Sequence, residues 1–209
     1  EPEGMDAETA TLFPRELQES ELGPIPTGWQ VAKIEELVEL AYGKALKATE
    51  RKSGEVPVYG SGGLTGLHNE PLVNGPSVIV GRKGTVGSLY WEDRPFFPID
   101  TVFYVQAKVP LTYCFYLLQT LGLEHMNTDG AVPGLNRNNV YRLKVTMPVK
   151  EILFAFDGTV SVIRKKIFEN NQHIDILTTL RDTLLYRLIS GQLRLPESEE
   201  QFTEALTGT

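Results

Sequence analysis

A run of apolar residues at alternating steps of four and three constrains the fold of this chain more than any other feature. It follows Pro148, ends before Gly191, and occupies Phe156, Val160, Ile163, Ile167, Asn170, Ile174, Leu177, Arg181, Leu184 and Leu188. This is the a/d spacing of a helix that packs along another helix. At about 1.5 Å per residue, a helix over residues 149–191 is roughly 60 Å long. We therefore predict a long helix that acts as a spacer.

Two positions of this heptad pattern are polar, and they bear on the partner of the helix. An Asn at a core position, such as Asn170, fixes the register and the number of helices in a coiled coil. Arg181 is the second polar position, and the adjacent Leu180 can take over its contact. No other stretch of the sequence has a similar pattern, so we expect a second helix from elsewhere. The alternative is a helix that packs wholly on its own domain.

The charge of the chain is unevenly distributed. Its net charge is −7, but residues 1–22 hold seven acidic residues and one arginine, and residues 195–209 hold four acidic residues and no Lys or Arg. The body between them has 16 acidic and 19 basic residues, a net charge of +3. Such a balance permits DNA binding without requiring it, because clustering on one face decides the interaction.

The ends of the chain and its cysteine content set further limits. The single Cys114 excludes a disulfide framework and favours a reducing cytoplasm. No apolar run approaches the roughly 20 residues of a membrane span. We interpret residues 1–22 as an acidic linker or arm and residues 192–209 as a partly disordered C-terminal extension.

Residues 23–148 have the pattern of a globular domain. Helical spacings predict a short helix between Val31 and Leu40, and Pro110 precedes a buried helix from Leu111 to about Leu121. Apolar runs between turn residues predict strands at residues 56–59, 77–80, 89–91, 96–105 and 140–147. The expected fold class is α/β: a mixed α/β globular domain followed by a long coiled-coil-forming helix.

Three parts of this domain carry side chains suited to nucleic acid. Four cations between residues 44 and 52 form either a solvated face or a phosphate-contacting patch. Two Gly-rich loops, residues 60–66 and 81–87, are typical of hairpin turns, although Arg82 and Lys83 occupy the tip of the second. Residues 127–139 form a polar loop rich in Asn, a residue that suits both turns and adenine edges.

Signatures of catalysis and of metal binding are missing from the sequence. Neither Gly-rich loop matches a P-loop or a dinucleotide fingerprint. His68, His125 and His173 are scattered singly, so no metal site is predicted. We therefore predict no catalytic residue and no cofactor. Two alternatives remain open at this point: an enzyme that holds a nucleotide or phosphorylated substrate in the Gly-rich loops, and a coiled-coil scaffold protein.

Five segments in order resemble the DNA-specificity subunit of type I restriction-modification enzymes. They are LGPIPTGW at residues 22–29, VYGSGG at 58–63, VGRKG at 80–84, AVPGLNR at 131–137 and LISGQL at 188–193. In that family a target-recognition domain precedes a long separating helix, and a full-length subunit holds two such units. The resemblance thus implies a recognition domain at residues 23–148 and a spacer helix at 149–191. The chain resembles the C-terminal half of such a subunit, or a natural half-subunit that pairs with itself.

The resemblance also implies a function and a set of partners. The chain is expected to read one half of a bipartite target in double-stranded DNA, as a non-catalytic component of a complex of nuclease and DNA-adenine methyltransferase. Its expected partners are methyltransferase subunits, a restriction and translocase subunit, and a second recognition half or second copy bound through the long helix.

Loop position and donor type assign individual roles under this reading. The predicted phosphate contacts are Lys44, Lys47, Arg51, Lys52 and Lys83. The predicted base contacts are Ser61, Arg82, Asn136, Arg137 and Asn138, with Gly62 allowing close approach of the DNA. The predicted helix-packing residues are the apolar a/d positions Phe156, Val160, Ile163, Ile167, Ile174, Leu177, Leu184 and Leu188, together with Asn170.

Overall fold

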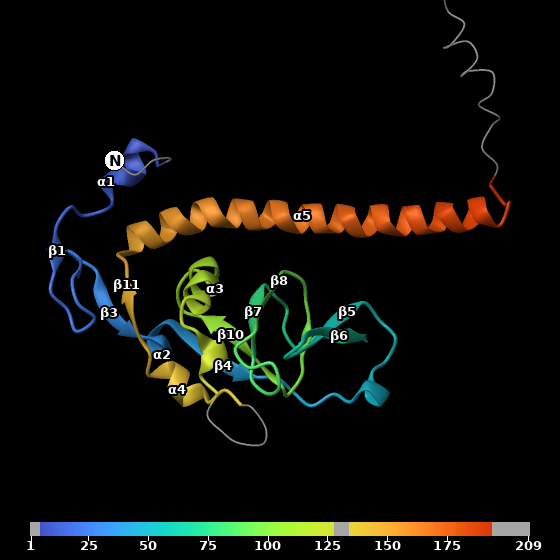
Figure 1. Ribbon diagram of the computed structural model, residues 1–209, viewed down its shortest axis with the longest axis horizontal. Helices are drawn as coiled ribbons and strands as arrows, with labels where there is room; N and C mark the ends of the chain where they lie inside the picture. The colour runs from blue at the N-terminus through green and yellow to red at the C-terminus, as the bar shows by residue number, and fades with distance from the viewer. Residues whose placement is uncertain (1–4, 128–133, 194–209) are drawn as a thin grey trace, which may run out of the picture. The chain divides into compact units, whose positions relative to one another are not determined.

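The computed structural model describes residues 5–127 and 134–193, in two compact units that divide between Val162 and Ile163, inside the long helix. The first unit holds the strands and the shorter helices of the described chain (Figure 1). The second holds the remainder of the long helix. The predicted class, a mixed α/β domain followed by a long helix, is confirmed. Segment 128–133 of the predicted polar loop and residues 194–209 of the predicted C-terminal extension lie outside the described residues.

A four-stranded antiparallel sheet in the order β4-β10-β7-β8 forms the centre of the first unit. The strands are β4 (Val38–Tyr42), β7 (Ser77–Gly81), β8 (Leu89–Glu92) and β10 (Val102–Ala107). Helix α3 (Leu111–Gln119) contacts β7 and β8 (Figure 1). The five residues of β7 are all buried, as an apolar strand in the middle of a sheet requires. The main core joins this sheet to α3 and the short helices.

Smaller sheets surround this centre. One has the order β6-β5-β9, with β5 (Val56–Gly60), β6 (Gly63–His68) and β9 (Phe97–Pro98). Two further pairs are β1 (Leu17–Gln18) with β2 (Ile25–Pro26), and β3 (Gln30–Lys33) with β11 (Lys144–Met147). Short helical turns complete the unit: α1 (Ala7–Thr11), α2 (Ile34–Leu37), η1 (Ala48–Glu50), η2 (Leu123–His125) and α4 (Arg137–Tyr141).

The helix predicted between Val31 and Leu40 is wrong. Only the four residues of α2 are helical there, between strand β3 and strand β4. Ile34 and Leu37 are buried from one turn of helix, whereas Val38 and Leu40 are buried from alternate positions of β4. A helical turn that runs directly into a strand thus mimics one continuous helical spacing.

The predicted polar loop and final strand also differ from the structure in detail. Helix α4 begins inside the predicted loop, because the side chain of Asn136 caps it by accepting a hydrogen bond from the Asn138 backbone N–H at 2.9 Å. Val140 is buried in this helix instead of opening a strand. Strand β11 therefore begins only at Lys144.

Helix α5 (Lys150–Ile189) confirms the predicted long helix, and its first turns pack within the first unit. Ile152 and Leu153 are buried, and Phe156 meets Tyr113 at a ring separation of 6.5 Å. Asp157 accepts a hydrogen bond of 2.7 Å from the Thr112 hydroxyl. In the described part of the chain, no helix combines the length and apolar character needed to cross a bilayer.

Beyond Val162 the apolar positions of the heptad pattern are exposed. Between 37% and 62% of the surface of each of these residues is accessible: Ile163, Ile167, Ile174, Leu177, Leu184 and Leu188. Water-facing apolar residues in a row weaken an isolated helix and favour a partner. The pairing predicted from the heptads stays a prediction.

A buried carboxylate joins strand β8 to the small sheet. The Tyr59 hydroxyl donates to Glu92 Oε2 at 2.8 Å, and the Arg94 backbone N–H and Nε donate to Glu92 Oε1 at 2.9 and 3.1 Å. Burial opposes ionisation of Glu92, but the hydrogen bonds from Arg94 and Tyr59 together outweigh it and lower the pKa of the carboxyl group. The ionised carboxylate therefore stabilises the fold.

Glu92→Gln is expected to lower the free energy of unfolding by about 1–3 kcal/mol at pH 7, because uncharged acceptors form weaker hydrogen bonds. A lowered pKa means that the stabilisation is present above about pH 4.5 and is lost as the pH falls through the folded-state pKa. Urea unfolding of both proteins from pH 7 to pH 3 should show their difference shrinking. Glu39→Gln, at an exposed position of β4, is the control and should change little at either pH.

Candidate nucleic-acid interface

One end of the four-stranded sheet gathers segments that are distant in the sequence. Strand β10 is antiparallel to both of its neighbours, with Phe103 paired to Tyr42 of β4 and Val102 paired to Gly81 of β7. The end of β4, the end of β7 and the start of β10 therefore lie together. The loop after β7 begins with Arg82 and Lys83, so both side chains originate at this end of the sheet.

Backbone pairing brings a third segment to the same place. The Leu135 N–H donates to the Arg82 carbonyl at 2.8 Å, and Lys83 and Gly134 form an antiparallel bridge. Arg82 and Lys83 both donate their N–H groups to the Thr101 carbonyl, at 2.9 and 3.1 Å. The chain then turns into α4 at its Asn136 cap. Segments about fifty residues apart are thus tied together by main-chain hydrogen bonds.

These segments line a hollow of about 410 Å³, which we call the sheet-end hollow. Its lining combines one aromatic ring with cations and amides: Tyr42, Arg82, Lys83, Gly134, Leu135, Asn136, Arg137 and Asn138. Five of the predicted DNA-contacting residues therefore meet on one surface. Whether they contact DNA stays a prediction.

Both arginines of the sheet-end hollow lie against the same ring. The Cζ atoms of Arg82 and Arg137 are 4.9 and 4.8 Å from the centre of the Tyr42 ring. Arg82 Nη1 also donates to the Asp100 carbonyl at 2.8 Å, and Arg137 Nη1 donates to the Leu40 carbonyl at 3.2 Å. Each guanidinium is thus oriented by one carbonyl and one aromatic face.

The sheet-end hollow is electropositive. Within residues 5–127 and 134–193, none of the ion pairs involves Arg82, Lys83 or Arg137. The two guanidinium–backbone bonds leave most of the five N–H donors of each arginine for another acceptor. Carbonyls and rings orient these cations without neutralising them, so the surface favours an anionic or acceptor-rich ligand.

The predicted residues Ser61 and Gly62 lie beside this hollow in the turn between β5 and β6. The Ser61 backbone N–H donates to Thr101 Oγ1 at 3.3 Å, and its carbonyl accepts from Ser88 Oγ at 2.6 Å. Thr101 is the residue whose carbonyl also holds Arg82 and Lys83. The first Gly-rich turn is therefore adjacent to the second, although it does not line the sheet-end hollow.

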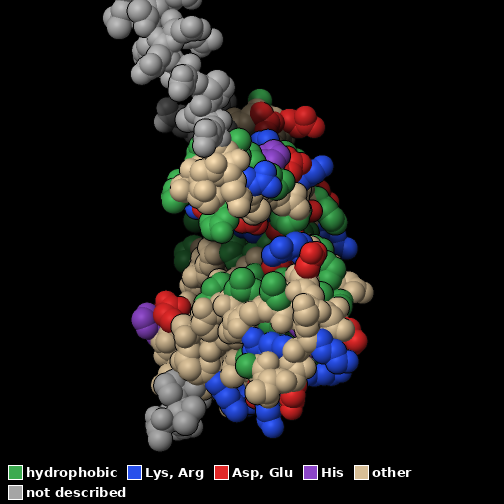
Figure 2. Space-filling model, turned by 90° about the vertical axis from the view of Figure 1, so that its right-hand side faces the viewer, with side chains coloured by type: hydrophobic (Ala, Val, Ile, Leu, Met, Phe, Trp, Pro, Cys, Tyr) green, Lys and Arg blue, Asp and Glu red, His purple; other side chains and the backbone are tan. Residues whose placement is uncertain are grey.

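The structure does not bring the basic cluster into the hollow. Arg51 Nη1 donates to the Thr65 carbonyl at 2.7 Å, and the Lys52 backbone N–H donates to His68 Nδ1 at 3.1 Å. Both residues therefore lie alongside β6. Lys47 pairs with Glu50 at 3.9 Å. Lys44 is two residues from Tyr42 and is exposed. Lys and Arg side chains gather on the face of the first unit that carries β5, β6 and η1 (Figure 2).

Tyr42 lines the sheet-end hollow with Gly134 and Leu135, and the sequence analysis assigned a role to none of these three. Tyr42 is 48% exposed at the end of β4, although its cross-strand neighbour Phe103 is buried. An aromatic residue placed directly before Gly43 and a cationic cluster was the available signal. Its importance depends on contacts with Arg82 and Arg137, which no local pattern encodes.

The comparisons with known proteins agree with this architecture. Residues 26–189 match the family model described as type I restriction modification DNA specificity domain. The chain belongs to this family. It is 23% identical, over 228 aligned residues, to the Type I restriction enzyme HindI specificity subunit of Haemophilus influenzae; the match covers 90% of this chain and 48% of that protein. The chain thus spans about half the length of this relative.

Solved structures of specificity subunits share the fold. The crystal structure of a type I restriction-modification system S subunit from M. genitalium superposes with a TM-score of 0.66 at 19% identity, covering 78% of this chain and 46% of that one. The HsdS subunit from Thermoanaerobacter tengcongensis gives a TM-score of 0.51 at 15% identity, covering 88% and 49%. At these identities the likeness concerns the fold alone.

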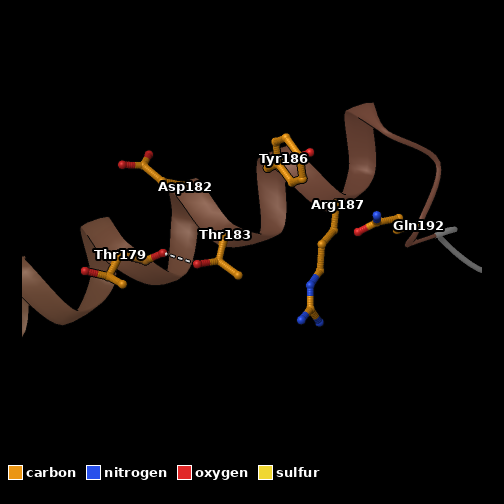
Figure 3. A pocket seen from close by; sticks show the side chains of 6 residues that line it. All are labelled: Thr179, Asp182, Thr183, Tyr186, Arg187 and Gln192. Carbon is orange, nitrogen blue, oxygen red and sulfur yellow. Dashed lines mark hydrogen bonds between the residues drawn. The ribbon is translucent and has the colours of Figure 1, made fainter.

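A second hollow, of about 530 Å³, lies on α5. Unlike the sheet-end hollow, it does not gather cations and amides from several segments. It is lined by Thr179, Asp182, Thr183, Tyr186, Arg187 and Gln192. Their side chains point in different directions from one helix and the turn that follows it (Figure 3).

The described residues contain no group of His, Cys, Asp and Glu able to hold a metal ion. Burial raises the pKa of the Cys114 thiol to about 12, so this thiol is a poor nucleophile.

Glycines shape the second Gly-rich loop for structural reasons. Gly87 has a φ of +72°, and a Cβ atom there would lie 2.3 Å from the backbone of Leu123 and Glu124. A Cβ atom at Gly81 would lie 2.1 Å from the Thr85 carbonyl. The loop is therefore closed against its own backbone and η2, as a tight connection between β7 and β8 requires, and this weakens the reading as a phosphate cradle.

Gly87→Ala is expected to destabilise the first unit by at least about 2 kcal/mol, because it combines a left-handed backbone conformation with a backbone clash. Gly62→Ala is the matched control, since a Cβ atom there meets nothing within 4 Å and its φ is not positive. Urea denaturation should show a shift for Gly87→Ala and almost none for Gly62→Ala. Equal stabilities would show that the 81–87 loop relaxes away from η2.

Proposed function

We propose that this chain recognises a specific sequence in double-stranded DNA, as one half of the specificity component of a type I restriction-modification enzyme. The observation that carries this proposal is the sheet-end hollow. It joins Arg82 and Lys83 to Asn136, Arg137 and Asn138 through main-chain hydrogen bonds, and no carboxylate of the described residues neutralises its cations. Family membership supports the same conclusion.

The side chains of the hollow suit readout of base edges. Arg bonds to O6 and N7 of guanine and Asn bonds to N6 and N7 of adenine, each with two parallel hydrogen bonds. Arg82 and Arg137 are oriented before binding, so little side-chain entropy is lost when they meet a base. Asn138 is exposed on α4, next to Arg137. We assign base contacts to these residues, together with Asn136 and, from the neighbouring turn, Ser61, where Gly62 allows close approach.

Phosphate contacts are assigned to Lys83 and to the cations of residues 44–52. Lys83 lies on the lining of the sheet-end hollow and Lys44 is two residues after Tyr42, whereas Lys47, Arg51 and Lys52 continue along η1 and β6. Contacts to phosphates fix the register of a protein on the duplex, whereas contacts to bases specify the sequence. On this proposal the phosphate-contacting cations supply affinity, and the base-contacting side chains supply specificity.

Helix α5 is assigned the role of spacer and subunit contact. Its exposed apolar positions beyond Val162 are proposed to pack against the equivalent helix of a second recognition half or of a second copy. On this reading residues 23–148 are the recognition domain and residues 149–191 are the spacer. The methyltransferase and restriction subunits carry out methylation and cleavage, and this chain itself uses no cofactor. The proposed site of action is the cytoplasm.

Selection from a random duplex library tests the recognition proposal. The purified chain is incubated with the library at low and at moderate salt, bound duplexes are sequenced, and the selection is repeated with methyltransferase subunits added. A short motif shared among the selected duplexes supports the proposal. Binding without sequence preference, or no binding in either mixture, contradicts it.

Arg137→Ala is expected to relax the preference at one base position of this motif, at a cost of about 1–3 kcal/mol, if its contact is bidentate. Lys83→Ala is expected to weaken binding to all duplexes alike and to reduce the slope of log K against log salt by about 1. Competition titrations with single-base variants of the selected duplex separate the two effects. A uniform loss for Arg137→Ala would make it a phosphate contact instead.

Leu177→Glu is expected to abolish self-association of the chain, because it places a charge in the apolar a/d face. Leu177 is 62% exposed, so its own domain loses little packing. Ile176→Glu is the matched control, since Ile176 is equally exposed at 63% but lies off the heptad positions. Light scattering should show a dimer for the unmodified chain and for Ile176→Glu, and a monomer for Leu177→Glu. A dimer in all three would place the contact elsewhere.

A further inference from the structure

Tyr42 connects the two arginines of the sheet-end hollow, although they come from segments more than fifty residues apart in the sequence. Arg82 Cζ and Arg137 Cζ lie at almost equal distances from its ring, 4.9 and 4.8 Å. Each arginine has a second aromatic neighbour at a greater distance: Phe103 at 5.8 Å from Arg82 and Tyr141 at 5.6 Å from Arg137. Tyr42 is the ring that the two guanidinium groups share.

The Tyr42 ring is itself held by the sheet. It meets the Phe103 ring edge to face at a separation of 5.0 Å, and Phe103 is its direct cross-strand partner in the β4–β10 ladder. Phe103 is 1% exposed and belongs to the main core. Aromatic cross-strand pairs of this kind fix ring orientation. The position of Tyr42 is thus set by the core, although nearly half of its surface faces solvent.

The ring of Tyr42, not its hydroxyl, makes these contacts. Within the described residues its hydroxyl forms no hydrogen bond, whereas its face attracts both cations through the ring quadrupole. Planar guanidinium groups stack on aromatic faces, which restricts rotation about their long side chains. One ring therefore sets the orientation of two forked hydrogen-bond donors at once.

We propose that Tyr42 is a positioning residue that sets Arg82 and Arg137 as a pair and so determines specificity at two base positions together. This inference rests on the proposed DNA recognition. The chemistry of a guanidinium fork makes guanine the base favoured at both positions. Loss of the ring frees both forks, whereas loss of the hydroxyl leaves them in place.

Two variants and a control test the proposal in the full chain. Tyr42→Leu removes the ring, Tyr42→Phe removes only the hydroxyl, and Tyr116→Leu removes a partly exposed ring on α3 that meets Phe115 and Phe156 edge to face. The first readout needs no DNA: side-chain NMR of the Arg82 and Arg137 guanidinium groups, assigned by Arg→Lys variants. Rotation about both Nε–Cζ bonds should accelerate in Tyr42→Leu and stay unchanged in Tyr42→Phe and Tyr116→Leu.

The second readout is the base preference of each variant on the selected duplex. Tyr42→Leu should lower discrimination about three- to tenfold at each of the two positions that Arg82→Lys and Arg137→Lys relax singly. Tyr42→Phe and Tyr116→Leu should keep the preference of the unmodified chain. Relaxation at one position, at neither, or equally with Tyr42→Phe would overturn the proposal.

The two readouts also separate this inference from the proposed function. Faster guanidinium rotation in Tyr42→Leu, in a chain that selects no DNA motif, leaves the positioning role standing and contradicts DNA recognition. Unchanged rotation in Tyr42→Leu, in a chain that does select a motif, contradicts the positioning role alone. Thermal unfolding of each variant checks that the fold is retained. Tyr42 is half exposed, so its replacement should lower the melting temperature only slightly.

Discussion

The antiparallel pairing of β10 with both β4 and β7 is the constraint on which the proposed interface depends. It places the end of β4, the end of β7 and the start of β10 at one end of the sheet. The hydrogen bond from the Leu135 N–H to the Arg82 carbonyl then fixes the segment before α4 beside the loop after β7, and the N–H groups of Arg82 and Lys83 tie that loop to the Thr101 carbonyl. Cations that would repel one another are thus held together by backbone hydrogen bonds, which are independent of side-chain charge.

The hollow combines order with unused binding capacity. Its arginines are oriented by the backbone carbonyls of Asp100 and Leu40 and by Tyr42, and most of their donors remain without a partner in the described chain. A surface of this kind is costly to assemble, because like charges are brought close together. The tight connection at Gly87 and the buried Glu92 network supply stability nearby without adding a carboxylate to the hollow. Structural support and binding capacity are therefore assigned to different residues.

The sequence predicted the fold class, the apolar strands β5, β7, β8 and β10, and the helices α3 and α5, because these elements carry long or strongly apolar patterns. It failed where short elements meet. Residues 31–40 contain a strand, one helical turn and a second strand. The apolar residues of these three short elements together happen to have the spacing of one helix. The start of α4 was missed because Asn136 suits both a loop and a helix cap. Within the site, donor type singled out Arg82, Asn136, Arg137 and Asn138, but not Tyr42.

The sequence by itself determined the long helix and its apolar a/d face, since a heptad repeat is a local property read along one element. It also determined which segments carry donors suited to nucleic acid. Only the tertiary structure decided which of them meet: it joined residues 82–83 to 134–138, left Arg51 and Lys52 along β6, and left Lys47 at η1. The physical reason is that strand pairing and the ring of Tyr42 act between residues far apart in the chain, and no local pattern records such contacts.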